Sequence, residues 1–220
     1  MEHLIAVAGG SGTRMGGGTP KQFLLLNGKP VLLHTLEKFY AYNPKVNIVL
    51  ALPEAEIETW KQIVKNHTIT IPHAFVKGGQ SRSQSVRNAL NVLGDSGLVA
   101  IHDGVRPLVS IETITRCFEE ARKTGAAIPV MPLTDSLRRY TGTGSVAEDR
   151  AKFCAVQTPQ VFDVALLKKA YEKAGSKDFT DDAAVVEAAG HRVSPVDGNV
   201  ENIKITAPFD VKVAEVVMNL

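Results

Sequence analysis

The chain has 220 residues, of which 44% are hydrophobic and 22% are charged, and its 25 Lys and Arg against 23 Asp and Glu give a formal net charge of +2. This composition excludes an intrinsically disordered chain and predicts a single globular domain over residues 1–220. The basic residues form no run, so we expect no nucleic-acid partner. No segment approaches the ~18 consecutive apolar residues of a membrane span, so we expect no membrane partner either.

The only cysteines in the sequence, Cys117 and Cys154, belong to no CxxC or Cys/His cluster. This pattern predicts a reducing compartment, two buried thiols and no structural zinc. The N-terminal segment MEHLIAVAGG lacks the basic and apolar regions of a secretion signal. We therefore expect a cytoplasmic protein.

Short apolar segments rich in β-branched residues alternate with longer amphipathic segments, which is typical of a parallel sheet flanked by helices. The predicted strands, in chain order, are residues 4–8, 46–52, 70–76, 98–102, 126–129 and 193–196. The predicted helices are residues 31–42, 54–66, 81–93, 111–123, 164–174, 181–189 and 209–218. The expected fold is α/β: a Rossmann-like three-layer sandwich with a mainly parallel, twisted sheet.

A polar segment at residues 136–153 interrupts this alternation. The sequence GTGS at residues 142–145 is a turn signal between two polar arms, which predicts a protruding β-hairpin. An isolated two-stranded hairpin is at best marginally stable, so we expect the arm to pack against another surface. A second copy of the chain is the simplest candidate, and we therefore expect a homodimer.

A glycine-rich loop, AGGSGTRMGGGTPKQ at residues 8–22, follows the first predicted strand. Its glycines allow backbone N–H groups to converge on phosphate oxygens at the ligand crevice of an α/β sheet. The dinucleotide motif GxGxxG fails at Met15, and the P-loop motif GxxxxGK[ST] fails at Gly18, where its lysine is required. Arg14 and Lys21 bracket the glycines, a placement that predicts a clamp for a polyphosphate, and the alternative of two solvated surface charges is weaker.

Further polar residues are expected at the same crevice. Asp103 and Arg106 follow the fourth predicted strand, where an acid binds ribose hydroxyls or a metal; a simple turn is the alternative role for Asp103. The segment GGQSRSQSV at residues 78–86 opens a helix with Ser81 or Ser83 as its N-cap. It is either a loop that binds a base edge or only a strand-to-helix turn.

Three other features have modest or structural interpretations. In NIKIT, residues 202–206, a predicted late strand places Lys204 opposite to its isoleucine neighbours, where it needs an anionic partner or solvent. Asp181 and Asp182 lie in a predicted first helical turn, where the helix dipole alone accounts for their charges. The histidines show no metal-ligand spacing, and we expect His102 to be structural.

Together these motifs are similar to those of a known group of enzymes. The loop GGSGTRMGGGTPKQF resembles the signature loop of nucleotidyltransferases that activate sugar or polyol phosphates. Within that group, the later motifs resemble the 2-C-methyl-D-erythritol 4-phosphate cytidylyltransferase family of the non-mevalonate isoprenoid pathway: GGQSRSQSV, HDGVRP at 102–107, EDR at 148–150, QTPQVF at 157–162, FTDDA at 179–183 and NIKIT. The resemblance spans nearly the whole chain. Gly104 departs from the alanine common in the family, and Ser136 from its usual threonine.

The resemblance implies roles for individual residues. Nucleotide binding is implied for Ala8, Gly9, Gly10, Gly12, Gly79, Gln80, Ser85, Asp103 and Gly104. Binding of the acceptor polyol phosphate is implied for Asp103, Arg106, Ser136, Arg150, Thr180 and Lys204. The catalytic candidates are Arg14, Lys21, Arg150 and Lys204. By the same resemblance, Arg150 reaches the site of the neighbouring subunit; from composition alone it is a surface charge on a hairpin.

The implied reaction transfers CMP from CTP to 2-C-methyl-D-erythritol 4-phosphate and releases pyrophosphate. An acceptor phosphate oxygen attacks the α-phosphorus, so positive charge matters more than a protein nucleophile. We expect Mg²⁺ as the divalent cation, held mainly by the CTP phosphates, with no protein ligand assigned. The alternatives are a ribitol 5-phosphate cytidylyltransferase and a non-catalytic nucleotide-binding regulator. The presence of both Arg14 and Lys21 disfavours the regulator.

Overall fold

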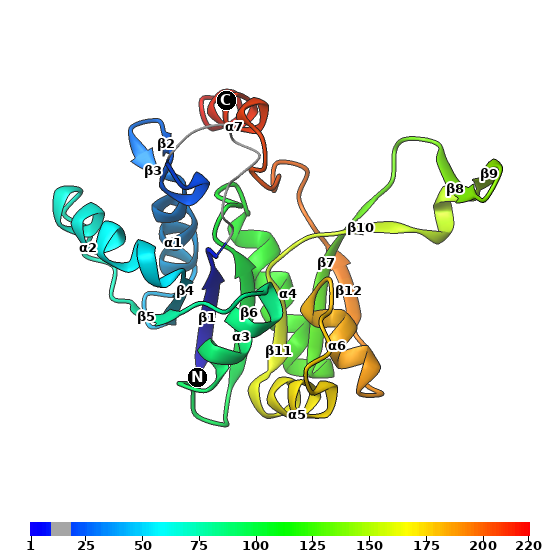
Figure 1. Ribbon diagram of the computed structural model, residues 1–220, viewed down its shortest axis with the longest axis horizontal. Helices are drawn as coiled ribbons and strands as arrows, with labels where there is room; N and C mark the ends of the chain where they lie inside the picture. The colour runs from blue at the N-terminus through cyan, green and yellow to red at the C-terminus, as the bar shows by residue number, and fades with distance from the viewer. Residues whose placement is uncertain (10–18) are drawn as a thin grey trace.

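The structure is a computed structural model that describes residues 1–9 and 19–220. Within these residues an eight-stranded sheet has the order β10-β7-β11-β6-β1-β4-β5, and β12 pairs with β7 (Figure 1). The pairs β1–β4, β1–β6, β4–β5 and β7–β12 are parallel, whereas β10 and β11 run antiparallel to their partners. The mainly parallel sheet is therefore confirmed. Its strands are β1 Glu2–Val7, β4 Asn47–Leu52, β5 Ala74–Lys77, β6 Leu98–Asp103, β7 Ala126–Pro132, β10 Cys154–Val156, β11 Gln160–Asp163 and β12 Ser194–Asp197.

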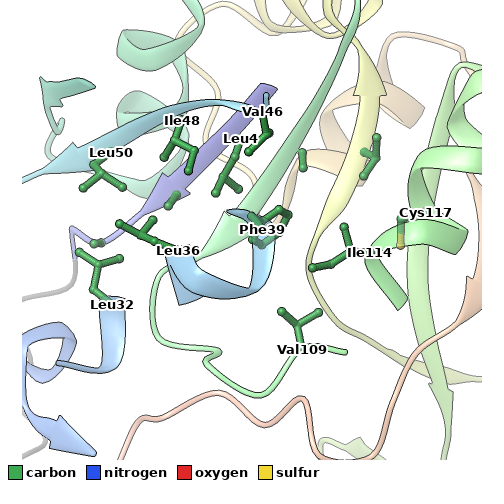
Figure 2. Close-up of a cluster of buried hydrophobic side chains, with 14 of the residues drawn as sticks. Leu4, Leu32, Leu36, Phe39, Val46, Ile48, Leu50, Val109, Ile114 and Cys117 are labelled. Carbon is green, nitrogen blue, oxygen red and sulfur yellow. The ribbon is translucent and has the colours of Figure 1, made fainter. Parts of the chain in front are cut away.

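Helices cover both faces of the sheet, which confirms the three predicted layers. Along β1, Leu4 and Ala6 face a core that includes side chains of α1, α2 and α4, while Ile5 and Val7 face a core under α3, α5 and α6. Figure 2 shows part of the first core, in which side chains of α1, among them the aromatic Phe39, and of α4 lie against those of β1 and β4. The helices are α1 Val31–Tyr42, α2 Ile57–Asn66, α3 Arg82–Leu90, α4 Ile111–Thr124, α5 Val164–Ala174, α6 Asp182–Ala188 and α7 Pro208–Met218.

Local sequence signals set the helix ends close to their predicted positions. At the start of α4, the Ser110 side chain accepts a hydrogen bond from the Thr113 N–H, and at its end Gly125 adopts a left-handed φ of 85°. Asp163 caps α5 in the same way by accepting from the Leu166 N–H. The helix predicted over residues 54–66 begins with a 3₁₀ turn, η3 Glu54–Glu56, and continues as α2.

The prediction missed four short strands. β10 and β11 have three and four residues, and β2 (Leu25–Leu26) and β3 (Lys29–Pro30) have two each, which is too short to display an alternating pattern. The strand predicted over residues 70–76 is shorter in the structure, because pairing with β4 begins only at Ala74.

The predicted strand over residues 202–206 is wrong, because this segment joins no ladder. The Ile205 N–H donates to the Val105 carbonyl at 2.9 Å, and the Ile205 side chain is buried in a third core beside β2 and α7. The expected alternation still holds without a strand: Ile205 is buried and Lys204 is exposed.

The two cysteines differ in their surroundings. Cys117 is buried in α4 as predicted, and burial raises the pKa of its thiol to about 12. Cys154 is exposed, so the prediction of a buried thiol is wrong there. The physical reason is its place on β10, a strand at the end of the sheet whose three residues are all exposed.

The predicted hairpin arm is present. β8 (Leu137–Thr141) and β9 (Gly144–Glu148) pair antiparallel, and the arm extends away from the sheet (Figure 1). Its side chains are largely exposed, including 91% of Tyr140. Packing of the arm against a second copy stays a prediction. In the described part of the chain, no helix is long and apolar enough to cross a membrane.

Candidate active site

The carboxyl ends of β1 and β6 open into a cleft. These strands are parallel and in register, so that Val7 lies opposite Asp103 at the same edge of the sheet. The cleft brings the predicted cations Lys21 and Lys204 together with most of the predicted nucleotide-binding residues, namely Ala8, Gly9, Gly79, Gln80, Ser85 and Asp103. Gly10, Gly12 and Arg14 were also predicted here and lie outside the described residues.

A second cleft adjoins the first on the acceptor side. Predicted residues Arg106 and Thr180 line it, and Arg82, Asp103 and Lys204 line both clefts. Asp103 and Lys204 therefore stand where the two clefts meet. This arrangement suits a reaction between two ligands, one in each cleft.

Two predicted acceptor residues are not among the described residues lining either cleft. Ser136 is exposed and precedes β8. Arg150 is exposed in a 3₁₀ turn, η4 (Arg150–Lys152), where its guanidinium donates to the Thr134 carbonyl at the base of the arm. Both residues lie at the base of the arm, so their role depends on where the arm packs.

Gly104, also predicted on the nucleotide side, is buried between Asp103 and Val105, which line the first cleft, and is not itself among the lining residues. Its N–H donates to the Val7 carbonyl at 2.9 Å, and an added Cβ would come within 2.9 Å of Leu32 Cδ1 and 3.1 Å of Ala8 Cβ. The glycine therefore lets this turn approach the first strand closely. An alanine at this position requires a small shift of the neighbouring side chains.

Asp103 is the centre of a charged cluster. Its carboxylate lies 3.0 Å from Lys204 Nζ, 3.2 Å from Arg106 Nε and 3.6 Å from Arg82 Nε, and only 9% of its side chain is exposed. Burial raises the pKa of this carboxyl, but the three cations outweigh burial and hold the pKa well below its ordinary value. Asp103 is therefore ionised and pre-organises the positive groups around it.

Arg82 is the main site residue that the sequence interpretation did not single out. It is the first residue of α3, and besides Asp103 it contacts Asp182, whose fully buried carboxylate is 2.7 Å from Arg82 Nη2. Tyr171 donates to the other oxygen of Asp182 at 2.6 Å. Burial opposes ionisation of Arg82, yet the carboxylates of Asp182 and Asp103 raise its pKa above the ordinary value. A cation in the first turn of a helix is unfavourable without an acidic partner, because the helix dipole is positive at that end. An arginine at this position is therefore the sequence feature that could have indicated an acidic partner.

The sequence predicts that Asp181 and Asp182 serve the dipole at the start of a helix, and the structure confirms this role only for Asp181. The Asp181 carboxylate accepts from the Ala184 N–H at 3.0 Å and caps α6. Asp182 instead lies buried against Arg82 and Tyr171, which a local sequence pattern does not show.

The loop before α3 is held by serine hydroxyls. Ser81 is the N-cap, because its Oγ accepts from the Gln84 N–H at 3.2 Å. Ser85 Oγ accepts from the Gly79 N–H and donates to the Ser81 carbonyl, both at 3.0 Å. An added Cβ at Gly79 would lie 2.1 Å from Gln84 Cγ, so only glycine fits. The segment is therefore a strand-to-helix turn that hydrogen bonds hold in place, and Gly79, Gln80 and Ser81 line the cleft.

His102 is fully buried and supports the turn that follows it. Thr158 Oγ1 accepts from the Asp103 N–H at 3.1 Å, so its hydroxyl proton is free to donate to His102 Nδ1 at 3.0 Å. His102 Nε2–H then donates to the Arg106 carbonyl at 3.2 Å. Burial lowers the pKa of His102 to about 4, which makes the ring neutral near pH 7. These contacts agree with the expected structural role.

Comparisons with known proteins identify the family. The model of the 2-C-methyl-D-erythritol 4-phosphate cytidylyltransferase family (IspD) matches residues 2–220. The chain belongs to this family. It is 48% identical over 216 residues to the enzyme of that name from Phocaeicola vulgatus, covering 98% of this chain and 99% of the relative. It is 49% identical over 214 residues to the one from Bacteroides fragilis, covering 97% and 98%.

Solved structures of the same family share the fold. The crystal structure of 2-C-methyl-D-erythritol 4-phosphate cytidylyltransferase from Thermus thermophilus has a TM-score of 0.82 and 32% identity, covering 100% of this chain and 98% of that one. The 4-diphosphocytidyl-2C-methyl-D-erythritol synthase structure from Anaerococcus prevotii has a TM-score of 0.86 and 28% identity, covering 100% and 96%. The expected family and α/β fold are thereby confirmed.

Proposed function

We propose that the chain transfers CMP from CTP to 2-C-methyl-D-erythritol 4-phosphate, giving the CDP-polyol and pyrophosphate in non-mevalonate isoprenoid biosynthesis. The observation that supports this most strongly is the meeting of two clefts at Asp103 and Lys204, in a chain that matches one cytidylyltransferase family along its length. One cleft suits the nucleotide and the other the acceptor.

The chemistry needs charge and alignment more than a reactive side chain. A phosphate oxygen of the acceptor attacks the α-phosphorus of CTP, the bond from that phosphorus to the bridging oxygen breaks, and pyrophosphate leaves. The protein holds two anions together and stabilises the charge that develops on the α-phosphate and the leaving group. Lys21 is the described cleft residue that we assign to this stabilisation. Arg14, outside the described residues, is its expected partner.

Lys204 is our candidate for holding the acceptor phosphate. It lines both clefts, and 40% of its side chain is exposed, so an incoming phosphate can reach the ammonium group. Asp103 holds that ammonium group before the acceptor binds. Arg106 donates to the Asn202 carbonyl at 2.7 Å and to Asp103, and thereby fixes the segment that carries Lys204.

Mg²⁺ belongs to the proposal as a charge-neutralising ion on the triphosphate. No group of three or more His, Cys, Asp or Glu among the described residues is arranged to hold a metal ion. Asp103 is the one carboxylate among the described residues that line the first cleft. Three cations already surround that carboxylate, so the ligands that we expect for Mg²⁺ are phosphate oxygens and water.

A homodimer completes the proposed site. Arg150 and Ser136 lie at the base of the arm, which buries little within its own chain. We assign both to the acceptor site of a second copy that the arm reaches. Cys117 and Cys154 are both free thiols, which fits the cytoplasmic location that we propose.

The test is pyrophosphate release by the purified protein with CTP and Mg²⁺, comparing 2-C-methyl-D-erythritol 4-phosphate with ribitol 5-phosphate as acceptor. We expect turnover with the first acceptor only. Turnover with ribitol 5-phosphate alone would contradict the proposed acceptor and keep the mechanism. CTP binding without release from either acceptor would contradict the transferase and favour the regulator.

A further inference from the structure

Gln22 is a buried polar residue with no partner in the described part of the protein. It lines the first cleft and is only 1% exposed. Neither its Nε2 nor its Oε1 has a hydrogen-bond partner among the described residues. Buried polar groups in folded proteins are nearly always paired, because an unpaired one loses its hydration without compensation. A cleft residue that keeps both amide groups unpaired suggests a ligand that pairs them.

The backbone around Gln22 is firmly anchored. Gln22 is the middle residue of the 3₁₀ turn η2 (Lys21–Phe23). The next side chain, Phe23, stacks on Trp60 of α2 with ring centroids 5.8 Å apart and an interplanar angle of 14°. Trp60 is fully buried and donates from Nε1 to His73 Nε2 at 3.0 Å. This packing fixes the backbone that carries Gln22 at the edge of the cleft.

The chemistry of the amide indicates which part of a nucleotide it binds. Phosphate oxygens only accept hydrogen bonds, so they would pair Nε2 and leave Oε1 facing negative charge. The nucleoside part offers neutral groups that donate as well as accept: the ribose hydroxyls, and the cytosine edge with its amino group and ring nitrogen. We infer that the Gln22 side-chain amide binds the nucleoside part of CTP, an inference that rests on the proposed function and adds a residue to its site.

The test replaces Gln22 with Met, which keeps the length of the side chain and removes both polar groups. Binding of CTP, without any acceptor, is measured by calorimetry, and tripolyphosphate is the probe that lacks the nucleoside. We expect CTP affinity to fall by about tenfold or more, as the loss of two hydrogen bonds predicts. Tripolyphosphate binding should not change. The melting temperature of the free protein should be unchanged or higher, because the variant buries no unpaired amide.

A matched control and a second nucleotide sharpen the result. Gln62→Met, on the exposed surface of α2, should change neither binding nor melting temperature. With 2′-deoxy-CTP, a contact to the ribose 2′-hydroxyl predicts equal binding by wild type and Gln22→Met. A contact to the 3′-hydroxyl or to the base predicts the same loss as with CTP, and either result supports the inference.

Three outcomes would overturn the inference: unchanged CTP affinity, an equal loss of tripolyphosphate binding, or a lower melting temperature of Gln22→Met, which would place the amide's partner within the protein. Because binding is measured without an acceptor, the inference can fail while wild-type turnover stands. The inference can also hold if the wild type binds CTP but transfers no CMP to either acceptor.

Discussion

Replacing Asp103 with Asn tests the charged cluster at the junction of the clefts. The variant keeps the shape of the side chain and the hydrogen bond from the residue 103 N–H to Thr158, but leaves three cations without their shared carboxylate. Removing one partner of a buried ion pair lowers the free energy of unfolding by about 3–5 kcal/mol. Arg82 retains Asp182, and Lys204 is 40% exposed to water, so we expect the lower end of this range.

The expected loss of about 3 kcal/mol corresponds to a melting temperature about 6–12 °C lower for a chain of this size. The assay is urea unfolding at pH 7, followed by circular dichroism, with a thermal melt of the same samples. The matched control is Asp95→Asn, because Asp95 lies closer to its lysine, 2.6 Å from Lys168 Nζ, but is 85% exposed. That variant should leave the free energy of unfolding close to the wild-type value, because water screens an exposed ion pair. Equal stabilities of the two variants would refute the reasoning that burial makes the Asp103 cluster strong.

Three further predictions concern the core, the pH dependence and the arm. Leu36→Ala removes a fully buried side chain and should lower the free energy of unfolding by about 2–5 kcal/mol in urea, whereas Leu25→Ala, at a 56% exposed site, should change it by less than about 0.5 kcal/mol. The His102 pKa is lowered to about 4 from 6.5, so its contribution to stability is fully present above pH 6.5 and is lost as pH falls toward 4; unfolding curves across that range should show it, and an equally steep loss in His102→Gln would contradict it. Arg150→Ala should raise KM for the polyol phosphate without changing KM for CTP or the melting temperature, and an unchanged KM for the polyol would remove Arg150 from the site.

The helices and the parallel strands could be predicted because each shows its pattern locally. The helix over residues 31–42 follows Pro30, begins and ends as expected, and turns one apolar face to the sheet. The antiparallel strand β11 could not be predicted, because its direction is set by pairing with β6 and β7, which are distant in sequence. A four-residue strand carries no local signal of direction.

In the candidate site, too, some features could be predicted from the sequence and others could not. Asp103 could be placed beside Ala8 and Gly9, which follow the first strand, because the carboxyl ends of parallel strands share one edge of the sheet. The contact between Arg82 and Asp182 joins α3 to α6, which lie far apart in sequence, and only tertiary packing creates it. The unpaired amide of Gln22 is likewise visible only once its neighbours are known. Arg150 remains a prediction because its expected partner is a second copy.

The central claim is that positive charge in the first cleft drives CMP transfer, and one comparison tests it most directly. Pyrophosphate release from CTP and 2-C-methyl-D-erythritol 4-phosphate is measured for the wild type, for Lys21→Ala, and for Lys61→Ala, which removes an exposed lysine of α2 that pairs with Glu58. We expect Lys21→Ala to lower kcat by about 10²–10³ with an unchanged melting temperature, and Lys61→Ala to match the wild type. Near-normal kcat in Lys21→Ala would contradict the claim.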